Sequence, residues 1–123
     1  MPYTNDAKHM MLAALVGKTT PDTPVTALSL HSADPSTTGA NEISGGGYAR
    51  ITVTDTDFDA PASGEVLLNN DKLFSGTASQ VVSHFGAWNG TTFLAGGAIT
   101  GDGAFNSSGE YTLQTGTKFD LNA

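Results

Sequence analysis

The chain has 123 residues, a formal net charge of −7 and no cysteine, and only 14% of its residues are charged. This length fits one domain, and the missing cysteines exclude disulfides and thiolate metal ligands. The five basic residues are scattered, which argues against binding to nucleic acid or to an anionic membrane surface, because both need clustered positive charge. No apolar run approaches the ~20 residues of a membrane-spanning helix.

The N-terminal segment is predicted to form a helix over residues 4–16. Thr4 is a good N-cap, Asp6 suits the first turn, and Gly17 is a natural stop. Apolar residues recur at helical spacing, namely Ala7, Met10, Met11, Ala14 and Leu15. We expect this stripe to pack on the domain's own sheet, although Met-rich stripes also dock on partners. Because no basic region precedes the apolar patch, we interpret the segment as mature structure and not as a signal peptide.

The rest of the chain is predicted to be β structure. After a linker at 18–24, strands are expected at 25–32, 49–57, 65–68, 73–74, 81–88, 92–100, 111–114 and 118–121. Asn89-Gly90 is the strongest hairpin signal, and Thr115-Gly116 is expected to turn the last two strands onto each other. Short strands at this spacing predict a mostly β single domain with one N-terminal helix. Residues 25–123 would form an antiparallel β-sandwich or small barrel, jelly-roll-like in arrangement.

A long polar loop, 33–48, separates the first two predicted strands. It begins with Asp34-Pro35 and ends with Gly45-Gly46-Gly47. Loops of this length are usually functional or disordered. The glycine run is not a phosphate loop, because no Lys-Ser/Thr follows it and a strand comes next. We expect a neighbouring subunit to order the loop, so that Gly46→Val would impair assembly more than folding.

No group of residues predicts a cofactor, a metal centre or catalysis. The histidines lack the spacing of a ligand pair; they are His9, His31 and His84. Asp55, Asp57 and Asp59 begin like a calcium loop. However, Ala60 stands where the turn glycine is needed, and Val66 where a closing Glu is needed. We interpret these aspartates as one solvated strand face, with a calcium site of another kind as the alternative. Without a Gly-x-Ser-x-Gly elbow or an acid/base carboxylate pair, the chain is predicted to be non-enzymatic.

Two features near the predicted hairpin leave alternatives open. Trp88 either covers the end of the core, which we favour, or faces outward as an interface anchor. Gly96-Gly97 inside a strand predicts either a bulge or a close backbone approach.

Three neighbouring segments carry a family signature: Leu30-His31-Ser32-Ala33-Asp34-Pro35, Thr38-Gly39-Ala40-Asn41-Glu42-Ile43 and Ser44-Gly45-Gly46-Gly47-Tyr48-Ala49-Arg50. Together they resemble the signature of small tailed-bacteriophage virion proteins, which are labelled tail-fibre-like or capsid-decoration proteins. The N-terminal helix and the strand Ser83–Trp88 are also similar to that family. The chain departs from the pattern at Ser32, where the family often has Thr, and at 19–23, which looks like an expanded linker.

The resemblance implies a non-enzymatic structural role in the virion. The first interpretation is a capsid decoration, or cement, protein that binds the major capsid protein and stabilises the head. The alternative is a tail-fibre or tail-tip protein involved in host attachment, with Trp88 and Tyr48 as candidate contacts and tail proteins as partners. A bacterial surface domain without a phage connection is a third option. A homo-oligomer such as a trimer is expected, with neither nucleic acid nor membrane as a partner. The predicted interface residues are Pro2, Tyr3, Asp34, Pro35, Asn41, Glu42, Gly45, Gly46, Gly47, Tyr48 and Trp88.

Overall fold

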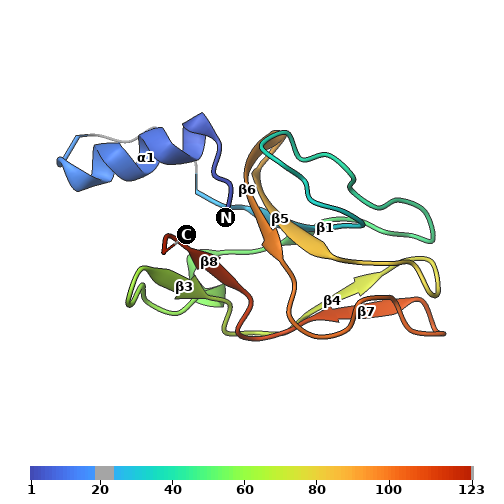
Figure 1. Ribbon diagram of the computed structural model, residues 1–123. Helices are drawn as coiled ribbons and strands as arrows, with labels where there is room; N and C mark the ends of the chain where they lie inside the picture. Colours follow the sequence, from blue (N-terminus) through green and yellow to red (C-terminus); the bar gives the residue numbers. More distant parts are fainter. Residues whose placement is uncertain (19–23, 123) are drawn as a thin grey trace.

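A computed structural model describes residues 1–18 and 24–122. The elements in chain order are α1 (Asn5–Leu15), β1 (Ala27–His31), β2 (Ile51–Thr52), the 3-10 turn η1 (Asp55–Asp57), β3 (Glu65–Leu67), β4 (Lys72–Ser75), β5 (His84–Asn89), β6 (Thr92–Ala98), β7 (Glu110–Leu113) and β8 (Lys118–Asp120). The predicted fold class is confirmed: one N-terminal helix precedes antiparallel sheets arranged as a small sandwich and not as a closed barrel (Figure 1). Most of the predicted linker lies outside the described residues.

One layer is a four-stranded antiparallel sheet with the order β2-β1-β5-β6. Its centre is the pairing of β1 with β5, which runs from Ala27 opposite Trp88 to His31 opposite His84. The predicted β5–β6 hairpin is confirmed. Asn89 pairs with Thr92, so the loop is Gly90-Thr91, one residue later than predicted. Gly90 there has a φ of 55°, a left-handed value that glycine adopts without strain.

The other layer is one long antiparallel ribbon with an interruption in the middle. Its two halves are the pairs β3–β8 and β4–β7. Leu67 lies opposite Lys118 and Lys72 opposite Leu113, so both strands advance by five residues and the register continues unchanged. The prediction that 111–114 and 118–121 turn onto each other is therefore wrong.

Hydrogen bonds between two bends explain why the ribbon continues. The Asp71 carboxylate accepts hydrogen bonds from the backbone N–H of Thr115 at 2.8 Å and from its hydroxyl at 2.9 Å. Leu68 N–H donates to the Thr117 carbonyl, and Gly116 N–H donates to the Leu68 carbonyl. The turn residues in both segments therefore form matching bends in paired strands and do not close two separate hairpins.

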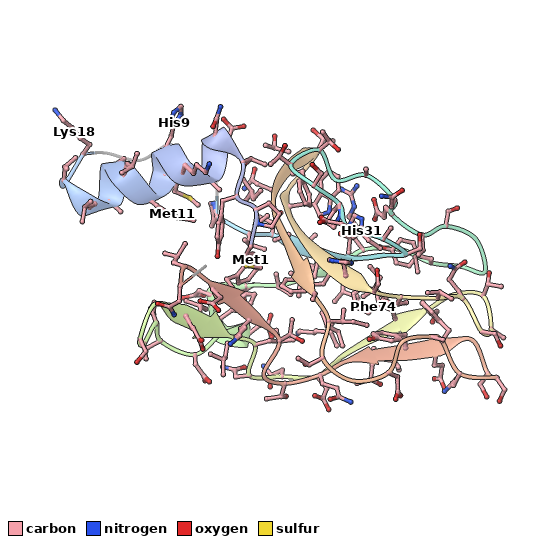
Figure 2. The ribbon with its side chains drawn as sticks, viewed as in Figure 1. Met1, His9, Met11, Lys18, His31 and Phe74 are labelled. Atoms are coloured by element: carbon pink, nitrogen blue, oxygen red, sulfur yellow. The ribbon has the colours of Figure 1, made fainter. Side chains whose placement is uncertain are left out.

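The apolar core fills the space between the sheet and the ribbon. Leu28 and Leu30 point into it from β1, as their alternation predicts, and Phe74 enters from the ribbon (Figure 2). Other buried members are Ile43, Val53, Leu68, Val82, Phe85, Ala87, Phe105, Tyr111 and Leu113. The predicted strand at 49–57 is shorter than expected, because the chain leaves β2 and enters η1. Val53 is nevertheless buried between the exposed residues Thr52 and Thr54.

Helix α1 extends away from the sandwich (Figure 1). The Thr4 hydroxyl caps it by accepting a hydrogen bond from Ala7 N–H at 3.2 Å, as predicted. The expectation that its whole apolar stripe packs on the sheet is wrong. Ala7 is buried, but Leu15 is 79% exposed because the helix leaves the body after its first turns.

Two neighbouring residues on β4 allow a test of the core. Phe74→Ala should lower the free energy of unfolding by about 3–5 kcal/mol, because it removes a fully buried ring. Leu73→Ala, at a position 55% exposed, should change it by less than about 0.5 kcal/mol. Urea denaturation followed by tryptophan fluorescence measures both values. Similar losses for the two variants would contradict this assignment of the core.

Candidate functional site

The face of the central sheet that points away from the core is also buried, but it is polar. Ser29 and His31 alternate with the core leucines on β1, and both are 0% exposed. A side chain on Gly86 of β5 would meet Ser29 Oγ at 2.5 Å and His31 Nε2 at 2.6 Å, so Gly86 shares this face. Trp88 is on the same face and is 8% exposed. The loop 33–48 covers these residues as a third layer.

A chain of hydrogen bonds connects this face to the loop. Trp88 Nε1–H donates to Ser29 Oγ, and Ser29 Oγ lies 2.7 Å from His31 Nε2. On the other side of the ring, His31 Nδ1 lies 2.7 Å from the Ala40 carbonyl. A carbonyl only accepts, so we assign the proton to Nδ1, and the Ser29 hydroxyl then donates to Nε2. With the histidine neutral, the indole N–H of Trp88, the hydroxyl of Ser29 and both ring nitrogens of His31 therefore all have hydrogen-bond partners.

Burial is the main cause that lowers the pKa of His31. The hydrogen bond to Ala40 and the charge of Glu42 act in the opposite direction. A Ser–His pair also occurs at nucleophilic active sites. Here Ser29 has no exposed surface, and the second ring nitrogen of His31 contacts a backbone carbonyl instead of a carboxylate. In this arrangement the pair holds the loop against the sheet.

A second cluster fastens the far end of the loop. Arg50 Nε and Nη2 donate to the two carboxylate oxygens of Glu42 at 3.0 and 2.9 Å. The Tyr48 hydroxyl donates to Glu42 at 2.9 Å and accepts from Leu30 N–H at 3.0 Å. The Arg50 guanidinium also lies 3.5 Å from the centre of the Trp88 ring, a cation–π contact. The cluster therefore links the loop to β1 and to β5.

These contacts shift the ionisation of the cluster. Burial alone would raise the pKa of Glu42, but hydrogen bonds from Arg50 and Tyr48 hold it below the usual value. Burial, together with the neighbouring carboxylate, raises the pKa of Tyr48. The ion pair and the neutral phenol are therefore stable at neutral pH.

The first half of the loop is a set of tight turns. Asp34 Oδ1 accepts a hydrogen bond from Ser36 N–H at 2.8 Å, and the Asn41 amide donates to the Asp34 carbonyl at 3.0 Å. Pro35 is buried against Gly96, where any side chain would clash with the proline ring. The close approach predicted at Gly96-Gly97 is thus present, whereas the strand irregularity lies between Ala87 and Trp88.

The glycine run returns the chain to the sheet. Gly45, Gly46 and Gly47 have φ values of 89°, 63° and 83°, all in the left-handed region. A side chain on Gly46 would also come within 2.5 Å of the backbone of Gly76 and Thr77. The expectation that a neighbouring subunit orders the loop is therefore corrected, because contacts within the chain hold it at every turn. Gly46→Val should impair folding first.

The three aspartates after β2 do not share a strand face, because Asp55 and Asp57 belong to η1. Asp57 accepts hydrogen bonds from Lys72 at 2.7 Å, Asn70 at 3.1 Å and Thr54 N–H at 3.0 Å. Lys72 is the main cause that lowers the pKa of Asp57. Within residues 1–18 and 24–122, no group of three His, Asp or Glu side chains is placed to hold a metal ion.

A comparison with protein families gives a match over nearly the whole chain. The family described as podophage GP4 fiber I protein gp80 matches residues 2–123. The chain belongs to this family. It is therefore a structural protein of a tailed-phage virion. A search of curated proteins finds no significant match. In the part of this fibre-family protein that the structure describes, no helix is long and apolar enough to span a membrane.

The predicted interface residues of this fibre-family protein fall into three groups. Trp88 and Pro35 are buried, so the outward-facing interpretation of Trp88 is not supported. Trp88 lies under the loop on the face that points away from the core, so it does not cover the end of the core either. Four residues are partly buried: Pro2, Tyr3, Glu42 and Tyr48. The exposed ones are Asp34, Asn41, Gly45, Gly46 and Gly47. Contact of these residues with another subunit stays a prediction.

The N-terminal segment forms a small addition to the edge of the sheet. Tyr3 bridges Ala95 of β6, and Thr4 N–H donates to the Leu94 carbonyl at 3.0 Å. The Tyr3 hydroxyl donates to the Asp120 carbonyl at 3.2 Å, and burial raises its pKa. These bonds attach the start of the chain to both layers.

Sequence reasoning missed Ser29 and Arg50 as members of the site. Ser29 alternates with leucines and looks like an ordinary solvent-facing strand residue. For Arg50 the sequence did offer a signal, the acidic residue Glu42 in the same signature. Arginine commonly pairs with a carboxylate through two hydrogen bonds, and it also stacks on tryptophan rings.

Valine at adjacent glycines separates strain from collision. Gly46→Val and Gly47→Val both place a β-branched residue at positive φ, which costs on the order of 1–3 kcal/mol. Nothing lies within 4 Å of a side chain at Gly47, whereas Gly46 meets backbone. Gly46→Val should therefore lower the free energy of unfolding, measured by chemical denaturation, by at least about 1 kcal/mol more than Gly47→Val does. Equal losses would show that the contact with Gly76 and Thr77 yields easily.

The buried histidine gives a pH dependence of stability. The pKa of His31 is lower in the folded chain than the ordinary value of 6.5, so below pH 6.5 the unfolded state binds a proton that the folded state refuses. The contribution of His31 to stability is fully present above pH 6.5, and it is lost as the pH falls through the pKa that His31 has in the folded chain. His31→Asn keeps a donor for Ala40 but does not titrate. In denaturation series between pH 7.5 and 5, it should show a smaller loss than the parent chain; equal slopes would contradict the role of His31.

Proposed function

We propose that this chain is a structural subunit of the tail fibre of a podophage. The family match carries the proposal, because it spans residues 2–123 and so concerns the whole domain described here. The match favours the tail-fibre alternative over the capsid-decoration interpretation. The partners in this proposal are other virion proteins of the tail.

The physical character of the domain supports a role in assembly. Its conspicuous polar groups, the Trp88–Ser29–His31 chain and the Glu42–Arg50 pair, are used to fasten the loop. A loop held in this way loses little conformational entropy when it meets a partner, which favours a rigid building block.

Direct host attachment through Trp88 and Tyr48 has less support. The Trp88 indole is buried and donates to Ser29, while the Tyr48 hydroxyl bridges Leu30 and Glu42. Neither group is free to bind a glycan without opening the loop. Loss of host binding in Trp88→Ala would therefore report damage to the fold.

Capsid decoration remains the second candidate, and one observation favours it. Tail fibres are usually repetitive, whereas these 123 residues carry no internal repeat and have a formal net charge of −7. A small domain of that kind suits addition in many copies to a shell lattice.

Particle localisation distinguishes the two candidates. Antibody raised against the purified chain, labelled with gold and applied to whole virions, should bind at the tail. Quantitative mass spectrometry of the same particles should find few copies per virion relative to the major capsid protein. Many copies spread over the head, with heads that burst more easily when the protein is lost, would replace the tail-fibre proposal by capsid decoration.

A further inference from the structure

The second half of helix α1 is apolar on all sides. Residues Met10–Val16 are seven consecutive apolar residues, and a helix that is apolar all round is normally buried. The sandwich covers only one side of it, leaving Leu12 57%, Leu15 79% and Val16 67% exposed. These three residues are the largest cluster of exposed apolar side chains on one element of the described chain.

An apolar groove lies between this helix and the sandwich. Its volume is about 630 Å³, and its lining includes Ala7, Met11, Val25, Phe58, Val66 and Phe119. Figure 2 shows Met11 on the side of α1 that faces the sandwich, above β3 and β8. Such a groove exposes apolar surface that a second helix or strand would remove from water.

The charges around the groove restrict what fills it. Three acidic residues line it, Asp55, Asp59 and Glu65, and the Glu65 carboxylate is already paired with Lys118 at 3.0 Å. The exposed apolar face of α1 carries the opposite charge: Lys8 precedes Leu12 and Val16 at helical spacing, and Lys18 follows the helix at its far end (Figure 2). Two of the chain's five basic residues thus lie on, or shortly after, the helix whose apolar face is uncovered.

We propose that α1 of one copy of this chain lies in the groove of a second copy. The apolar face formed by Leu12, Leu15 and Val16 then fills the groove, and Lys8 and Lys18 approach its carboxylates. In a two-fold arrangement both copies make the same contact, so each helix is covered twice: by its own sandwich and by its partner. The attraction is local, because two chains of net charge −7 otherwise repel each other.

This inference goes beyond the tail-fibre proposal and does not rest on it. Self-association is a property of the purified chain, whereas tail location is a property of the particle. Failure of one therefore leaves the other standing.

Sedimentation velocity over a concentration series of the purified full chain tests the interface. The parent chain should associate, and Leu15→Asp should weaken association by about tenfold or more, because a charge would enter the apolar groove. Leu73→Asp is the matched control: Leu73 is 55% exposed on β4 and outside the groove, so its substitution should leave association unchanged. Thermal melting monitored by circular dichroism shows that both variants fold.

A charge exchange tests whether the occupant is a second copy. Lys18→Glu and Asp59→Lys should each weaken association, and the double variant should restore it, since both charges come from the same chain only in self-association. A parent chain that is monomeric at every concentration overturns the proposal, and the occupant of the groove would then be sought among other virion proteins. Equal weakening by Leu15→Asp and Leu73→Asp, or no recovery in the double variant, also overturns it.

Discussion

Ser29 Oγ accepts a hydrogen bond from the Trp88 indole and donates one to His31 Nε2. The His31 Nδ1–H in turn donates to the Ala40 carbonyl, and this last bond joins the central sheet to the loop above it. A buried polar atom without a partner costs about 1–3 kcal/mol, so the three side chains are stable only together and only with Ala40 in place. Within residues 1–18 and 24–122, no buried side-chain nitrogen or oxygen lacks a hydrogen bond. The long loop is therefore a third structural layer. The central strands β1 and β5 are buried on both faces, one apolar and one polar.

The loop has two independent fastenings, and they differ in chemistry. Near Ala40 the hydrogen bond joins two neutral groups and involves the buried His31 ring, whereas Glu42 and Arg50 form an ion pair that lies partly exposed beside the Trp88 ring. Between them, the glycine run brings the backbone against Gly76 at a distance that no other residue permits. A virion protein with this construction presents a surface of fixed shape, whereas a flexible arm would have to be ordered by its neighbour.

Local signals predicted the local structure well. The Thr4 cap, the β5–β6 hairpin and the alternation of Leu28 and Leu30 all follow from residue types at short range. The pairing of strands far apart in the sequence could not be predicted in this way. Thr115-Gly116 has the residue types of a hairpin turn, and only the structure shows that Asp71 of another segment lies beside it. The polar face was missed for a similar reason. Ser29 and Trp88 are 59 positions apart, and a serine alternating with leucines is indistinguishable from a solvent-facing one until the loop is seen to cover it.

The interrupted ribbon has a consequence for the order in which the chain folds. The β5–β6 hairpin closes a loop of two residues, while Ser75 and Glu110 at the near end of the ribbon are 35 positions apart. Closing a larger loop costs more chain entropy, so the hairpin forms before the ribbon. Glu65 of β3 pairs with Asp120, so on a ribosome that layer stays open until residue 120 has been synthesised and has left the exit tunnel. The apolar side of the early hairpin is exposed throughout that time, and the second layer is the last part of the sandwich to assemble.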